Sequence, residues 1–261
     1  MCESLPRIAI IGGSGLENIL EASKIVHLET PYGTPSPISV GLMGNEEVAF
    51  LPRHGPKHDL PPHKVNYRAN LHSLKQVGVE RIIATNAVGA INETYVPGDL
   101  VIPSDILDFT TSRVSTFFES TPVTHIDVTE AYCNQVSNVL VECCRASKVQ
   151  VRDKAIMATT EGPRYETPAE IRMLRKLGSD IVGMTGAPEV FLARELEICY
   201  AAVCFVSNKA AGMQQRLSAV EVMNVGKRVM PSMLQLLRNA VERIPDERTC
   251  MCGTAIHQAQ V

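Results

Sequence analysis

The chain has 261 residues, of which 45% are hydrophobic and 20% are charged, and its formal net charge is -3. This composition is typical of a globular protein, and we expect one domain with a core over residues 7 to 240 and a tail over 245 to 261. The lack of a Lys/Arg run excludes the electrostatic pattern of a nucleic-acid binder. No apolar stretch approaches a membrane span and the N-terminus does not resemble a signal peptide, so we expect a cytoplasmic protein without a membrane partner.

The first predicted strand, Ile8 to Ile11, runs into a glycine loop in "IAIIGGSGL". Glycines at the end of a buried strand allow a ligand to approach the backbone closely. A dinucleotide is one candidate, but Asn18 stands where its G-x-G-x-x-G fingerprint needs the third glycine. A tight turn without a ligand and a small anion nest around Ser14 remain as alternatives.

Short apolar runs alternate with helical periodicity along the rest of the chain. The predicted strands lie at residues 24–28, 38–43, 48–51, 81–88, 99–103, 154–160, 180–185 and 200–207. The predicted helices lie at residues 65–76, 129–146, 168–177, 188–196 and 217–241. Alternating strands and helices indicate an α/β fold with a mixed central sheet flanked by helices.

Several predicted strands end in small or polar residues. These endings are Ser14 and residues 84–90, 159–163, 183–186 and 207–212. Because ligands bind at strand ends in open α/β sheets, we expect these endings to meet in one pocket.

The densest group of cationic and imidazole side chains lies between Pro52 and Tyr67. Arg53 and His54 directly follow a predicted strand, where a guanidinium can hold a phosphate or carboxylate by two parallel bonds. A solvated basic loop, in which His54, His58 and His63 have no role, is the alternative. The loop offers no metal-ligand geometry, and the chain contains no motif for hydrolysis by zinc or by a nucleophilic serine.

Eight cysteines are spread along the chain without C-x-x-C spacing, and we expect them to be reduced. Cys250 and Cys252 are the exception, because they are separated by one residue on a tail that we expect to be flexible. They could form a strained bridge with each other or bond to distant cysteines.

Several longer motifs resemble the trimeric purine nucleoside phosphorylase and 5'-methylthioadenosine phosphorylase family, from about residue 7 to 240. They are "GGSGL", "PRHGPKHDLPPHKVNYRANLHSLKQVGVERIIATNAVGAIN", "PGDLVIPSDILD", "TEGPRYETPAEIRMLRKLGSDIVGMTGAPEVFLARE" and "SNKAAG". The resemblance implies phosphorolysis of the N-glycosidic bond of purine nucleosides, with inorganic phosphate as co-substrate. It also implies no metal, no organic cofactor, and a homotrimer or a dimer of trimers.

The same resemblance implies roles for individual residues. The phosphate-binding residues are Ser14, Arg53, His54, Asn86, Ala87 and Thr185. The nucleoside-binding residues are Met184, which lies against the ribose, Tyr165, Glu166, Asn208, Lys209 and Ala210. His54, Glu166 and Asn208 are the expected catalytic residues.

Asn208, Ala210 and Glu166 indicate which purine is bound. Methylthioadenosine phosphorylases usually carry Asp at the positions of Asn208 and Ala210, whereas 6-oxopurine phosphorylases carry Asn at the first. An amide can donate to O6 and accept from N7–H, and the Glu166 carboxylate can accept from the N1–H that adenine lacks. A solvated or helix-capping acid is the alternative interpretation of Glu166.

Ala219, Val222 and Met223 align with the residues that bind the 5' group, and His125 resembles a histidine at the same end. The first three are apolar, although they could simply be core positions of an amphipathic helix. The combination predicts a preference for S-methyl-5'-thioinosine, inosine or guanosine. A 5'-methylthioadenosine phosphorylase, a non-catalytic nucleoside-binding protein and a Rossmann oxidoreductase are the alternatives.

Overall fold

A computed structural model of the protein describes residues 5–13, 16, 19–147, 150–257 and 259–261. Its strands are β1 (Ile8–Gly12), β2 (Glu21–Val26), β3 (Ile38–Met43), β4 (Glu46–Pro52), β5 (Arg81–Ala90), β6 (Leu100–Phe109), β7 (Val151–Thr160), β8 (Ile181–Gly183) and β9 (Cys199–Lys209). Its α-helices are α1 (Tyr67–Gln76), α2 (Asn134–Ala146), α3 (Pro168–Lys176), α4 (Glu189–Glu195) and α5 (Ala219–Val241), with short 3-10 helices η1 (Pro62–Lys64) and η2 (Met251–Thr254).

The described strands form one mixed sheet with the order β2-β3-β4-β1-β5-β8-β7-β6-β9. β1 runs parallel to β4 and to β5, whereas β2, β3 and β4 are antiparallel. β5 also pairs in parallel with β9, from Arg81 opposite Cys199 to Ala90 opposite Lys209. Because of this pairing, β5, β8, β7, β6 and β9 close into a ring.

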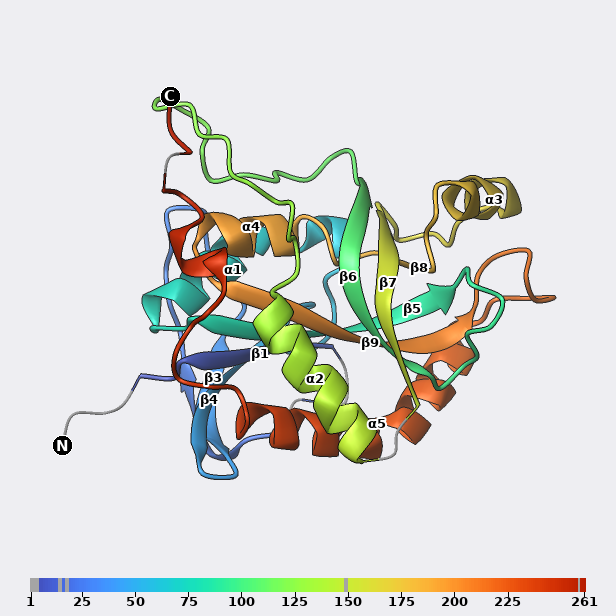
Figure 1. Cartoon of the computed structure of the whole chain (residues 1–261), viewed down its shortest axis with the longest axis horizontal. Helices are drawn as coiled ribbons and strands as arrows, with labels where there is room; N and C mark the ends of the chain where they lie inside the picture. The colour runs from blue at the N-terminus through green and yellow to red at the C-terminus, as the bar shows by residue number, and fades with distance from the viewer. Residues whose placement is uncertain (1–4, 14–15, 17–18, 148–149, 258) are drawn as a thin grey trace.

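Helices cover both faces of the sheet, which confirms the predicted α/β architecture (Figure 1). α1 and α4 contribute Leu71, Leu74, Val190 and Leu192 to one core cluster. α2 and α5 pack into the cluster on the other face through residues such as Leu140 and Leu237. The chain is therefore a single α/β domain in which each helix buries its apolar side against the sheet.

The observed elements lie close to the predicted ones, except that β6 continues along β7 to Phe109 instead of ending at Pro103, and that the start of α2 differs. This helix begins at Asn134 rather than at Thr129, because Tyr132 and Cys133 lead into it as buried residues and Cys133 is its extended N-cap. α3 begins as predicted after Thr167, whose side chain forms a capping box with Glu170.

The expectation of a flexible tail is wrong for the described C-terminal residues. Cys252 is buried in the core cluster that contains α2 and α5. Beyond it, the backbone N–H of His125 donates to Ala259 O and that of Val261 donates to Val123 O. These bonds join the C-terminal end to the loop before α2, and the two segments lie together at the top left of Figure 1.

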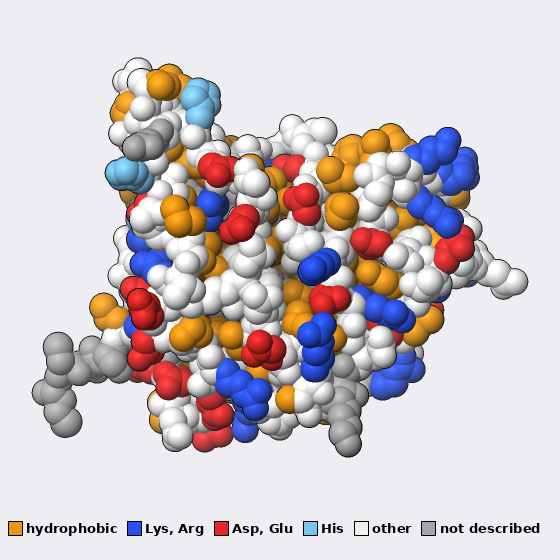
Figure 2. All heavy atoms as spheres, viewed as in Figure 1, with side chains coloured by type: hydrophobic (Ala, Val, Ile, Leu, Met, Phe, Trp, Pro, Cys, Tyr) orange, Lys and Arg blue, Asp and Glu red, His pale blue; other side chains and the backbone are white. Residues whose placement is uncertain are grey.

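Acidic and basic side chains are interspersed on the face shown in Figure 2, without a large area of one sign. Within the described part of the chain, no helix combines the length and apolar character that crossing a membrane requires.

Candidate active site

A cavity of about 770 Å³ opens where the strand ends meet. β5, β8 and β9 contribute Asn86, Gly183 and Asn208 to its wall, and the end of β1 contributes Gly13. The prediction that these strand endings form one pocket is confirmed for the described residues, whereas Ser14 lies outside them. Residues 159–163 do not line the cavity, although the segment that follows them supplies Tyr165 and Glu166.

The glycine loop has a packing role at its first position. A Cβ atom on Gly12 would lie 2.7 Å from Leu16 Cδ1 and 3.0 Å from a ring carbon of Phe50. A side chain at residue 12 would therefore displace the core beneath the loop. Gly13 lines the cavity, so the loop's second glycine lies where a ligand can approach the backbone.

Arg53 lines the cavity, but its charge is paired. Its Nε and Nη2 each donate to the carboxylate of Glu189 at 2.7 Å, and Nη1 donates to Thr85 O at 2.9 Å. Both side chains are buried, at 2% and 1% exposure. Burial alone would lower the pKa of Arg53, but the ion pair with Glu189 raises it, so Arg53 stays charged.

Of the two anions that the sequence allowed for the parallel bonds of Arg53, a phosphate or a carboxylate, the structure shows a carboxylate. The Nε and Nη2 atoms of Arg53 bind the Glu189 carboxylate, so this pair of donors is not available for two parallel hydrogen bonds to a phosphate. One N–H on Nη1 and one on Nη2 remain beyond these bonds. Tyr200 also donates to Glu189, at 2.7 Å, so the carboxylate is held from two sides.

His54 follows Arg53 at the same end of the cavity. Its Nδ1 lies 2.8 Å from Leu60 O and donates to it, because a carbonyl can only accept. Burial, together with the charge of Arg53, lowers the pKa of His54 to about 4. His54 is therefore neutral at pH 7, and its Nε2 carries a lone pair rather than a proton.

Asn86 and Thr185 complete this polar end. Asn86 Nδ2 donates to Thr185 Oγ1 at 2.8 Å, and both side chains are buried. Because that oxygen accepts from Asn86, the Thr185 hydroxyl hydrogen is left for another acceptor. Ala87 lines the cavity beside them. The structure thus brings together all the predicted phosphate-binding residues that it describes.

A second polar group lies further along the cavity. Asn208 Oδ1 accepts from Ser207 Oγ at 2.6 Å, and its Nδ2 donates to Lys209 O at 2.8 Å. Glu166 Oε1 accepts from Thr160 Oγ1 at 2.6 Å. Asn208 and Glu166 are 5% and 9% exposed, so their remaining bonding capacity is directed to the cavity they line.

The alternative interpretation of Glu166 as a solvated or helix-capping acid is wrong. Glu166 is buried, and α3 is capped instead by Thr167 and Glu170. Met184, Tyr165 and Ala210 also line the cavity as predicted. Lys209 does not, because its Nζ donates to Glu93 O at 2.7 Å, on the side of a separate depression.

The apolar end of the cavity is formed by α5 and the segment before it. These contribute Leu217, Val222, Met223, Val229, Met230 and Leu234 to the lining. Val222 and Met223 lie where the sequence placed them, at the N-terminal part of α5. Ala219, the first residue of α5, is exposed and does not line the cavity. His125 is also exposed and outside the lining.

Sequence reasoning missed the residues that hold the site together. Glu189 is a lone acid in the otherwise apolar segment "APEVFLA", and its burial is the signal that it has a cationic partner. Arg113 donates to the backbone oxygens of Met184 and Ala187 at 2.7 and 2.8 Å and pairs with Glu161 at 3.2 Å. Arg113 therefore holds the loop that carries Thr185 in place. The sequence around Arg113 contains no motif that would have indicated this role.

The cavity therefore has three chemically distinct parts: a polar end around His54, an amide and carboxylate pair, and an apolar end. A ligand with an anion at one end and a hydrogen-bonding ring beside it would match the first two parts.

Comparison with known proteins gives consistent matches. Residues 7–242 match the phosphorylase superfamily. The chain is 46% identical to a probable S-methyl-5'-thioinosine phosphorylase from Methanopyrus kandleri over 98% of this chain and 100% of the relative. It is 47% identical to a 6-oxopurine nucleoside phosphorylase from Pyrococcus furiosus over 98% and 99%. A crystal structure of a methylthioadenosine phosphorylase from an antarctic soil metagenomic library is similar with a TM-score of 0.93 and 37% identity, over 98% of this chain and 92% of the other.

Proposed function

The chain belongs to the phosphorylase superfamily and is a purine nucleoside phosphorylase, a pentosyltransferase, and from this premise we propose that it prefers 6-oxopurine nucleosides with an apolar 5' group. S-methyl-5'-thioinosine is the foremost candidate, followed by inosine and guanosine. The observation that carries the preference is that Asn208 and Glu166 line one cavity together, both buried.

The hydrogen bonds of these two side chains support a 6-oxopurine. Asn208 uses one N–H for Lys209 O, so its second N–H is available to O6. Its Oδ1 accepts from Ser207 and has a second lone pair, which can accept from N7–H of the purine once it is released. Glu166 Oε1 is occupied by Thr160, while the described residues offer no donor to Oε2, which suits the N1–H of hypoxanthine or guanine. Adenine has no hydrogen on N1 and would leave that oxygen without a partner.

We assign phosphate to the polar end of the cavity. Neutral His54 presents the Nε2 lone pair, so it accepts a hydrogen bond from a P–OH group. Thr185 donates its hydroxyl hydrogen, and the two remaining N–H groups of Arg53 donate to other phosphate oxygens. Ser14, outside the described residues, joins this set by resemblance.

The reaction then needs no covalent enzyme intermediate. A phosphate oxygen bonds to C1' as the bond between C1' and the purine nitrogen breaks, and the electron pair of that bond leaves with the purine. The sugar gains positive charge in the transition state and the purine gains negative charge. Phosphate stabilises the first, and donation from Asn208 to O6 stabilises the second. The products are the free purine and the ribose 1-phosphate.

A 5'-methylthioadenosine phosphorylase is the second candidate. The apolar end around Val222 and Met223 suits a methylthio group in either case, and a solved methylthioadenosine phosphorylase has the same fold. Phosphate-dependent release of base from inosine, guanosine, adenosine, methylthioadenosine and methylthioinosine separates the candidates. Faster turnover of the 6-amino nucleosides would overturn the assignment of Asn208.

The assembly that we propose is a homotrimer, alone or as a dimer of trimers. His125 resembles a histidine that lines the 5' end of the site, yet in one chain it is exposed and outside the cavity lining. A neighbouring subunit that brings its own His125 to this cavity would account for both facts. We also propose that the reaction uses inorganic phosphate and no organic cofactor.

A further inference from the structure

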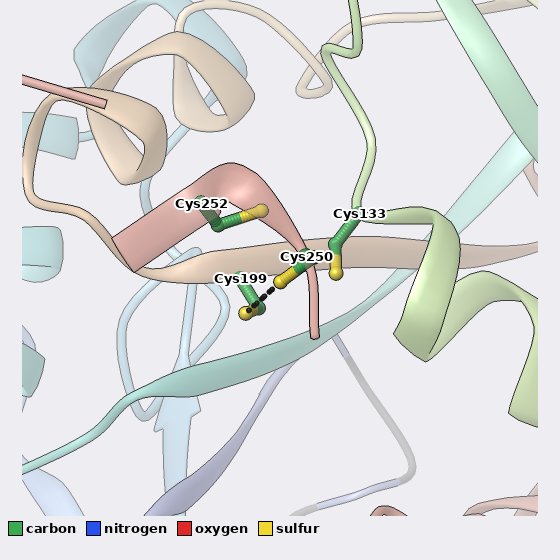
Figure 3. A group of neighbouring side chains, drawn as sticks. All are labelled: Cys133, Cys199, Cys250 and Cys252. Carbon is green, nitrogen blue, oxygen red and sulfur yellow. Dashed lines mark hydrogen bonds between the residues drawn. The ribbon is translucent and has the colours of Figure 1, made fainter. Parts of the chain in front are cut away.

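Four cysteines that are distant in the sequence meet in the folded chain, away from the cavity. Their sulfur atoms all lie within 4.8 Å of one another. Figure 3 shows that Cys133 comes from the start of α2, Cys199 from β9, and Cys250 and Cys252 from the C-terminal segment around η2. Three of the four are buried and Cys250 is half-buried. We call this group the cysteine cluster.

We propose that the cysteine cluster is a tetrathiolate site for a soft, tetrahedral divalent cation, with zinc as the expected ion. Zinc binds thiolate sulfur at about 2.3 Å, so neighbouring sulfurs of a tetrahedral site lie roughly 3.8 Å apart. In the cysteine cluster, Cys199 and Cys250 are 3.4 Å apart and every other pair lies within 4.8 Å. Small side-chain rotations would bring these sulfurs to the required spacing.

The mutual proximity of all four sulfurs favours a metal over two disulfides. A disulfide brings two sulfurs to about 2.0 Å and does not require the second pair to lie beside the first. A tetrahedral ion requires every sulfur to be close to the other three. A bridge between Cys250 and Cys252 would also close a very short loop, which strains the bond.

The surroundings suit the charge of such a site. Four thiolates around one divalent cation carry a net charge of -2, which nearby cations would stabilise. Arg248 lies against Gly253, the residue after Cys252, with its guanidinium 3.1 Å from the point where a Cβ atom on that glycine would lie.

The site would act as a structural anchor. Cys133 and Cys199 lie on the core elements, whereas Cys250 and Cys252 lie on the segment that leads to Ala259 and Val261. The metal would therefore tie the C-terminal segment, and the loop that pairs with it, to α2 and β9. The sequence has no metal-binding motif with a characteristic cysteine spacing at this site, because its ligands come from three separate parts of the chain.

The test begins with metal content. The whole protein is produced with zinc sulfate, purified under reducing conditions, and analysed by mass spectrometry of its metals. We expect about one zinc ion per chain in the wild type. Cys252→Ala should lose at least 80% of it, about a fivefold reduction, whereas Cys144→Ala should retain it. Cys144 is a matched control because it is a buried cysteine of α2 outside the cluster.

Cobalt provides a readout that does not depend on the variants folding. Zinc-free wild-type protein titrated with Co²⁺ should develop intense thiolate-to-cobalt absorption and the visible bands of a tetrahedral site, saturating at about one ion per chain. Added Zn²⁺ should abolish them. Failure of reduced wild-type protein to bind either ion would overturn the proposal. So would alkylation of the denatured, unreduced protein that finds these four cysteines blocked as disulfides.

Discussion

Arg53 and Glu189 lie 136 residues apart in the chain and are joined by two parallel hydrogen bonds of 2.7 Å in the interior of the protein. The pair connects the loop after β4 to the first turn of α4. Because Glu189 already offsets the positive charge of Arg53, the pair also limits the electrostatic attraction between Arg53 and the phosphate that we propose binds beside it.

Replacing Glu189 with Gln should destabilise the protein and increase its response to phosphate. Removing one partner of a buried ion pair leaves the other uncompensated and costs about 3–5 kcal/mol of unfolding free energy. A bound phosphate would then compensate Arg53 in place of Glu189. Thermal unfolding with and without phosphate should therefore show a larger stabilisation of Glu189→Gln than of the wild type. An equal phosphate response in both proteins would contradict this use of the Arg53 charge.

Asn208→Asp should reverse the base preference. A carboxylate facing O6 replaces a donor with a repulsive group, and kcat/KM for inosine should fall by about 10³-fold. The value for methylthioadenosine should fall less or rise. Asn239→Asp introduces the same charge on α5 outside the cavity lining and serves as the control. Equal losses on both nucleosides would show that Asn208 does not read position 6.

Val222→His should shift the preference at the 5' end. Val222 lines the cavity, so a histidine there can donate to a 5'-hydroxyl and opposes a methylthio group. The kcat/KM ratio of inosine to methylthioinosine should rise by about tenfold, the scale of one hydrogen bond of ~1–2 kcal/mol. Ala219→His, three residues earlier but outside the lining, should leave the ratio unchanged. The opposite pattern would place Ala219, not Val222, at the 5' group.

The lowered pKa of His54 predicts a specific loss of stability in acid. Its pKa is about 4 in the folded protein, against an ordinary value of 6.5, so the unfolded chain takes up the proton first as the pH falls. The stabilising contribution of neutral His54 is complete above pH 6.5 and is lost as the pH falls through about 4. The loss is at most about 3.5 kcal/mol, since one pKa unit corresponds to about 1.4 kcal/mol.

Urea unfolding between pH 4 and 7 would measure this effect. His54→Asn keeps a donor near Leu60 O but does not titrate, so its unfolding free energy should decline less over that range. Acidic groups such as Glu161, whose pKa is lowered from 4.5 to about 2, begin to lose their contribution below about pH 4.5, but they do so in both proteins, so the comparison with His54→Asn cancels their effect. Parallel curves for the two proteins would mean that His54 is not held neutral by the fold.

The proposed homotrimer predicts that activity depends on association. If a neighbouring subunit completes the cavity, dilution to monomer should reduce kcat/KM by at least tenfold. Sedimentation velocity at assay concentrations, compared with activity, measures this directly. A monomer with full activity would contradict a shared site.

Local patterns predicted most of the fold, because the apolar runs and the helical periodicity report which side of each element is buried. The cavity was predictable for the same reason, since polar residues cluster where strands end. The ion pair between Arg53 and Glu189 could not be predicted, and neither could the cysteine cluster. In both cases the residues come from distant segments that meet only in the folded chain. Helical periodicity groups Ala219 with Val222 and Met223 on one face of α5 but does not show where along the helix the cavity wall begins, and in the structure Ala219 lies outside the lining.

The pairing of β5 with β9 has a consequence for synthesis on the ribosome. β5 is complete at Ala90, but its partner strand and Asn208 emerge only after more than a hundred further residues. A nascent chain that ends before Cys199 therefore exposes one edge of β5, a surface prone to pairing with other chains. Such a chain also lacks the wall that holds Asn208. We expect truncated chains to aggregate and to bind no nucleoside, so that the site becomes functional only when translation is nearly finished.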